Sequence, residues 1–211
     1  MRVYASMFGV ITVMICSQYV VGQNVNKGYS FNIGLNFATP TFIYINNESF
    51  DKSILAYQFA FNKDFFSDKK LGLTVSLGFN KNSFNAKRQI GSIYSIKQID
   101  LSYLSFETGP SYKLSSNNLA FLGSVNLRIS RIISENYSDY YTGPSLSSSD
   151  IGLNFKIGTE QISKSKRPYL LFNYYYGLVK VAENSVLTGT GQSLNDYIRN
   201  QSIGIQLGFH F

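Results

Sequence analysis

Tryptophan is absent from this sequence of 211 residues, which holds one cysteine, at position 16, and one histidine, at position 210. A lone cysteine cannot form a disulfide within the chain, and zinc sites need several Cys or His ligands, so disulfide-stapled domains and zinc-binding modules are excluded. Charged residues make up only 15% of the chain, and no long basic run is present. We therefore predict no bound cofactor and no nucleic-acid partner. Beyond the N-terminal segment, no apolar run approaches the ~20 residues of a membrane-spanning helix.

Aromatic residues and glycine are abundant instead. The chain contains 16 Tyr, 17 Phe and 17 Gly, and its apolar fraction of 44% is ordinary for a folded protein. Aromatic side chains suit pleated surfaces, and glycine suits places where backbones bend or approach closely. The composition favours β structure.

Residues 1–22 have the pattern of a secretory signal peptide. Arg2 supplies the positive charge, the stretch from Phe8 to Cys16 is apolar, and Gly22 is a small residue at the expected cleavage point. This interpretation leaves residues 23–211 as one exported domain without cysteine. The alternative is lipidation of Cys16, although Ile15 stands before it where lipoprotein signals have a small residue.

Apolar and small polar residues alternate along eight segments, as expected for strands with two different faces. In the fourth segment the pattern begins on Ile99, Leu101 and Tyr103 and then continues on Leu104 and Phe106. This change of phase predicts a β-bulge near Tyr103-Leu104. The predicted strands cover residues 28–38, 54–65, 71–80, 97–114, 119–130, 150–160, 169–180 and 202–211.

The polar face of these strands is rich in Gly, Ser, Ala, Asn and Gln, which are compact enough to fill a narrow barrel lumen. The apolar face is then the outer one, toward lipid. The predicted connections alternate between short ones, at 64–70, 115–118 and 161–168, and longer ones, at 39–53, 81–96, 131–149 and 181–198. The sequence therefore predicts an all-β, eight-stranded antiparallel up-and-down transmembrane β-barrel, with short periplasmic turns, longer extracellular loops and periplasmic termini.

The segment YLSFETGPSYKL (103–114) and the terminal aromatic residue resemble the small outer-membrane β-barrel proteins of Bacteroidetes known as the PorT-like family, and more loosely the OmpA transmembrane domain. The resemblance implies residence in the outer membrane of a Gram-negative cell, in contact with its lipid. It also implies insertion by the barrel-assembly machinery, which recognises a C-terminal strand with aromatic residues, here Phe209 and Phe211. PorT-like relatives further suggest support of a secretion or gliding apparatus.

Charged residues on the predicted lumen face are the first candidates for function. Asp100, Glu107, Arg128 and Lys156 lie on neighbouring strands, and charges in a low-dielectric interior should pair. The pairing predicts either a salt-bridged plug that holds the strands in register or the gate of a narrow pore. An eight-stranded lumen is barely wider than its side chains, which favours the plug.

The loops are the second candidate, because binding residues concentrate on loops held by a rigid scaffold. Tyr137, Tyr140 and Tyr141 could contact a surface protein or a glycan, or could belong to the interfacial aromatic belt. His210 lies next to the chain's last residue, and Ser202 and Asp196 are distant from it in sequence, so we expect no catalysis.

Three functions remain open from the sequence. The first is an outer-membrane barrel with a structural or interaction role, which presents its loops to partners. The second is a narrow channel for small solutes. The third is a secreted barrel that binds lipid in its interior.

Overall fold

The computed structural model describes residues 28–43, 48–66, 69–90, 93–137, 145–146, 149–162, 167–187 and 193–211. The predicted signal peptide at 1–22 and the alternative lipidation site Cys16 lie outside these residues. Within the described part of the chain, no helix is long and apolar enough to cross a membrane.

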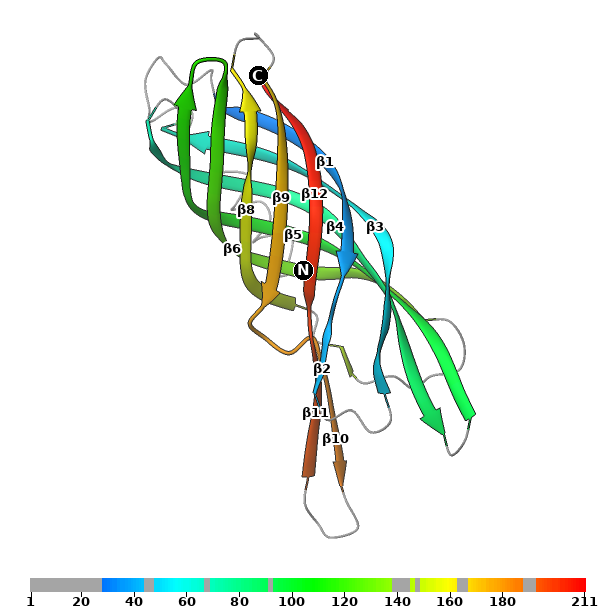
Figure 1. Ribbon diagram of the computed structural model, residues 1–211. Helices are drawn as coiled ribbons and strands as arrows, with labels where there is room; N and C mark the ends of the chain where they lie inside the picture. The colour runs from blue at the N-terminus through cyan, green and yellow to red at the C-terminus, as the bar shows by residue number, and fades with distance from the viewer. Residues whose placement is uncertain are drawn as a thin grey trace.

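Eight strands close into an antiparallel barrel in the order β1-β12-β9-β8-β6-β5-β4-β3 (Figure 1). The last strand closes the barrel against the first, with Ile205 opposite Leu35. The predicted fold class is thus confirmed. The barrel strands are β1 (Tyr29–Ala38), β3 (Glu48–Phe65), β4 (Leu71–Ile90), β5 (Ile93–Ser116), β6 (Leu119–Tyr137), β8 (Ser149–Gln161), β9 (Arg167–Gly177) and β12 (Gln201–His210).

Alternation along each strand separates an apolar outside from a polar inside, because successive side chains of a strand point to opposite faces. On β12 the outward side chains remain exposed, whereas the inward ones are buried; Leu207 is 58% exposed and its neighbour Gln206 only 3%. Glycine allows the strands to approach closely where the lumen is crowded. At Gly208 a Cβ atom would overlap the ring of Tyr169.

The predicted change of phase in the fourth strand is wrong. Leu101 and Tyr103 are buried inside the barrel, on the same face as Glu107, so alternation along β5 is unbroken. An irregularity does occur at this level, because the register between β5 and β6 shifts between Ser102 and Tyr103. The additional residue belongs to β6, where Ile133 lies between the paired positions.

Two of the short predicted turns are as short as expected, at 66–70 and 117–118, and the third lies between Gln161 and Arg167. The connection predicted at 81–96 is not a loop. β4 and β5 continue as a paired hairpin until Ile90 faces Ile93. β3, β4, β5 and β6 are consequently 18 to 24 residues long, whereas β1, β8, β9 and β12 have 10 to 13.

A second, four-stranded sheet continues the shorter side of the barrel. Its order is β2-β11-β10-β7, which repeats the order of the barrel strands β1, β12, β9 and β8. Figure 1 shows this sheet and the long β4–β5 hairpin projecting at the end opposite the C-terminus. The predicted loops at 39–53, 131–149 and 181–198 therefore contain strands. The sheet consists of β2 (Thr41–Ile43), β7 (Ser145–Leu146), β10 (Ala182–Leu187) and β11 (Ser193–Arg199).

Candidate functional site

The lumen carries an ion cluster at its middle. Lys156 Nζ on β8 lies 2.6 Å from Glu107 Oε2 on β5, and Arg128 Nε on β6 lies 3.8 Å from Glu107 Oε1. Asn154 donates a hydrogen bond of 2.9 Å to Glu107 Oε1. All four side chains are buried, so one carboxylate pairs with two cations that water does not reach. The structure thus brings together Glu107, Arg128 and Lys156 of the predicted lumen charges.

Asp100, the fourth predicted lumen charge, lies elsewhere. It follows from the unbroken alternation of β5 that Asp100 points away from the lumen, because Leu101 and Tyr103 point into it. Its carboxylate pairs with Lys81 Nζ at 3.0 Å, and Gln98 donates a second hydrogen bond. The expectation that Asp100 belongs to the lumen network was wrong, because it rested on the false change of phase.

Aromatic and polar side chains fill the lumen above the ion cluster. The guanidinium of Arg128 stacks 4.4 Å from the centre of the Tyr175 ring. Asn200 donates hydrogen bonds of 2.6 Å to the Tyr103 hydroxyl and 3.0 Å to Asp150 Oδ2. These contacts join β6 to β9, and join β5 and β8 to the residue before β12.

An apolar lid covers this layer at the end that leads to the projecting sheets. The lid is the cluster of Ala38, Phe84, Leu101 and Tyr103. Ile99 and Ile132 pack against it. The four lid residues are at most 2% exposed. A water-filled channel would leave its lining exposed, so within the described residues the lumen is blocked.

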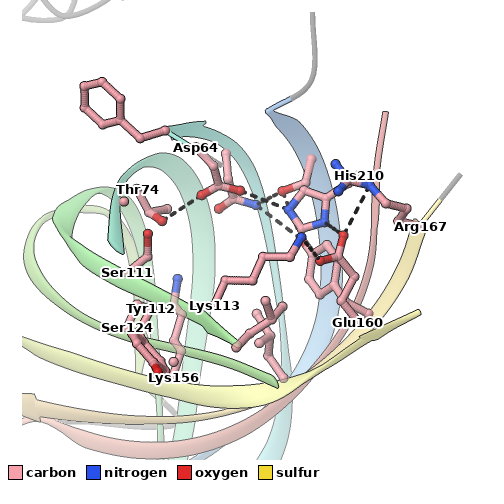
Figure 2. Close-up of a pocket in the computed structure, with 18 of the residues that line it drawn as sticks. Asp64, Thr74, Ser111, Tyr112, Lys113, Ser124, Lys156, Glu160, Arg167 and His210 are labelled. Carbon is pink, nitrogen blue, oxygen red and sulfur yellow. Dashed lines mark hydrogen bonds and ion pairs between the residues drawn. The ribbon is translucent and has the colours of Figure 1, made fainter. Parts of the chain in front are cut away.

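A second ion cluster occupies the other end of the lumen (Figure 2). His210 Nε2 lies 2.9 Å from Asp64 Oδ2, and His210 Nδ1 lies 2.9 Å from Glu160 Oε1. Glu160 also holds Lys113 Nζ at 2.5 Å and Arg167 Nε at 3.4 Å. Lys113, Glu160 and His210 all line a cavity of about 90 Å³ at this end.

Asp64 and Glu160 were not predicted as partners of His210 from the sequence. Both carboxylates stand at the inward positions closest to the turn end of their strands, as His210 does on β12, and this shared position was the available signal. Since both imidazole nitrogens face carboxylate oxygens, the ring has no free lone pair with which to activate a nucleophile. The described residues contain no cluster of His, Cys, Asp and Glu that could hold a metal ion.

The structure describes the side chains of only some of the predicted aromatic site residues. Phe209 and Phe211 point outward at the turn end, 53% and 57% exposed. Phe211 N donates to Tyr29 O at 3.0 Å, which fixes the end of the chain against β1. Tyr137 is the last residue of β6, and nothing is described of its side chain, while Tyr140 and Tyr141 lie outside the described residues.

No protein-family model and no curated protein matches this chain. Among solved structures, the outer-membrane protein OprG of Pseudomonas aeruginosa has a TM-score of 0.53 at 13% identity, over 88% of this chain and 97% of that one. Ail, the attachment invasion locus protein of Yersinia pestis, has a TM-score of 0.45 at 12% identity, over 88% and 99%. The likeness to OprG shows a shared fold: this chain has the architecture of the small outer-membrane β-barrels.

Proposed function

We propose that the protein is an integral outer-membrane barrel that does not conduct ions. It presents its four-stranded sheet and its β4–β5 hairpin, which we together call the extension, to a partner outside the membrane. The observation that carries this function is the combination of a blocked lumen with this extension beyond the lidded end of the barrel. A closed barrel serves as an anchor, and the extension is then the part of the molecule available for recognition.

The apolar outer surface supports the membrane location. Large apolar side chains stay exposed around the whole barrel, for example Ile33 at 59% on β1, Leu127 at 42% on β6 and Phe172 at 50% on β9. We call these outward side chains the belt. A belt of this extent is stable in lipid and would cause aggregation in water. We further propose insertion by the barrel-assembly machinery through Phe209 and Phe211, with the termini in the periplasm.

The partner is a surface protein or a glycan, and the setting suggested by the PorT-like resemblance is a secretion or gliding apparatus. The two alternatives from the sequence have less support. A narrow channel conflicts with the buried lid. A secreted lipid-binding barrel would need an apolar interior, whereas this lumen is filled with Asn, Gln and charged side chains. We propose no enzymatic activity, because His210 is held between two carboxylates.

The function is tested by shortening the β4–β5 hairpin. Asn85 faces Gln98 across the hairpin, so residues 86–97 can be replaced by an Asn-Gly turn without a change of register in the barrel. We expect the variant to keep its heat-modifiable migration on gels, which reports a folded barrel. On intact cells treated with a chemical crosslinker, the wild type should form a crosslinked species with its partner. The shortened variant should not form this species.

A matched control replaces the turn residues 117–118 by Asn-Gly at the opposite end, where the chain already turns between Ser116 and Leu119. The control should crosslink like the wild type. If all three proteins form the same crosslinked species, the extension is not the recognition surface and the proposal is wrong.

A further inference from the structure

At the end of the barrel where the C-terminus lies, a recess of about 410 Å³ is lined by the end of the β3–β4 turn, by β5, and by residues at the end of β8 and the start of β9. Lys113 N donates to Lys70 O at 2.8 Å, which ties the β3–β4 turn to β5. Ile162 N donates to Asn118 O at 2.9 Å, which ties the end of β8 to the β5–β6 turn. These two bonds hold Lys70, Lys113 and Ile162, which line the recess, to neighbouring backbone.

The recess is lined by an excess of positive charge. Lys69, Lys70, Lys113 and Arg167 all border it. Among the described residues, the carboxylate paired with the cations of this recess is Glu160, which is shared by Lys113, Arg167 and His210 and so cannot neutralise them all. Lys69 and Lys70 are exposed, and neither has a carboxylate partner among the described residues. An anion placed here would gain favourable interactions without breaking an existing ion pair.

The same recess reaches the apolar outside of the barrel. Leu114 and Ile162 line it together with the cations. Leu114 is an outward belt residue that is 43% exposed, and Tyr112 continues the belt from it along β5. A ligand in this recess thus meets cations at one end and an apolar wall at the other.

We propose that this recess binds the head group of an anionic phospholipid, with the phosphate at Lys69, Lys70 and Arg167 and an acyl chain along Leu114. Lysine and arginine near a membrane surface attract anionic head groups, and the apolar wall supplies what a bilayer lipid needs next to its phosphate. A soluble phosphate would use only the cations, and an acidic glycan would not use Leu114. The inference rests on the proposed membrane location of the barrel but not on the partner at the opposite end.

Native mass spectrometry of the purified barrel in detergent tests the site, with phosphatidylglycerol as the probe and phosphatidylcholine as the neutral comparison. We expect the wild type to retain phosphatidylglycerol preferentially. Lys69→Gln/Lys70→Gln should lower its affinity about tenfold to thirtyfold, from about one kcal/mol for each lysine. The matched control is Lys52→Gln/Arg131→Gln, which removes the same charge from two exposed cations outside the recess and should leave the affinity unchanged.

Leu114→Ser separates a lipid from a bare anion. It should weaken binding of phosphatidylglycerol but should not alter the binding of glycerol phosphate, which has no acyl chain. The proposal is overturned if both lipids bind equally, if the two double variants behave alike, or if glycerol phosphate displaces the lipid at comparable concentration. Recovery of the protein in the soluble fraction without detergent would instead contradict the membrane location itself, so the two failures are distinguishable.

Discussion

Glu107 shows how far single residues can be read from the sequence. Its inward position follows from the alternation of β5, and the cations of Arg128 and Lys156 follow from the alternation of β6 and β8. A buried carboxylate next to two buried cations has to pair with them, since an isolated buried charge is costly. This part of the lumen was therefore predictable without knowledge of the distances.

Glu107→Gln should destabilise the barrel strongly. The substitution preserves the shape of the side chain, leaves Lys156 without its paired carboxylate and removes the carboxylate 3.8 Å from Arg128. Removal of one partner from such a cluster costs about 3–5 kcal/mol of unfolding free energy. Urea unfolding in lipid vesicles, followed by the heat-modifiable gel shift, measures the loss.

Asp100→Asn is the matched control, because the Lys81–Asp100 pair lies on the outer face and is partly exposed. A partly exposed pair on the outer face should contribute less than the buried cluster, so this variant should lose clearly less stability than Glu107→Gln. Addition of Lys156→Met to Glu107→Gln should recover part of the lost stability. Equal stability of Glu107→Gln and Asp100→Asn would show that the lumen cluster is not a structural plug.

The partners of His210 could not be predicted from the sequence. Its partners Asp64 and Glu160 stand 146 and 50 positions away in the chain and come from β3 and β8, neither of which is a neighbour of β12 in the barrel. Strand alternation states which face a residue occupies but not which residues meet across a lumen. That information appears only once the barrel is closed.

At the scale of one element, β5 explains the main error in the predicted strands. Ile99, Leu101 and Tyr103 are apolar on the inner face, whereas Leu104 and Phe106 are apolar on the outer face. The inner face of β5 changes from the apolar lid to the polar lumen at the level where its outer face enters the belt. The apolar residues therefore move from the inner face to the outer face at this level. In the sequence this looks like a change of phase, although the strand alternates without interruption.

Two equivalent substitutions on β5 and β6 locate the edge of the membrane. Leu127 lies in the belt on β6, and Ile96 lies on β5 in the projecting hairpin; both are exposed, at 42% and 60%. Leu127→Lys should cost about 2–4 kcal/mol of folding free energy in lipid, because a lysine near the bilayer midplane is poorly solvated. Ile96→Lys should be close to neutral, since water surrounds the hairpin. Urea titration of both variants in vesicles gives the comparison.

The expected difference between the two variants depends on the proposed membrane location as well as on the two positions. Should Ile96→Lys be as costly as Leu127→Lys, the hairpin would itself be immersed in lipid or in a partner. Should both be neutral, the belt would not face lipid. Only a large difference between them agrees with a membrane edge between the barrel and its extension.

At the scale of the whole molecule, the two sides of the barrel are extended beyond the lid in different ways. β3 to β6 run without interruption into the extension, whereas β1, β8, β9 and β12 end near the lid and are followed or preceded by the separate strands β2, β7, β10 and β11. The sequence predicted the eight membrane strands because lipid on one side and a polar lumen on the other impose alternation. Beyond the belt no face of a strand has to be apolar toward lipid, so strict alternation is no longer required and these strands were interpreted as loops.

The blocked lumen leads to a prediction for the intact protein. Phe84, Leu101 and Tyr103 close the lidded end, and Arg128 stacked on Tyr175 closes the level below, where the ion cluster begins. We expect wild-type protein in planar lipid bilayers to show no steady ion conductance, while a general porin in the same lipid conducts. Phe84→Ala/Leu101→Ala/Tyr103→Ala removes the outer layer alone and should also remain silent, because the Arg128 layer persists. A steady conductance of the wild type that Arg128→Ala alters in ion selectivity would make the lumen a pore, and the anchoring role proposed for the barrel would then be wrong.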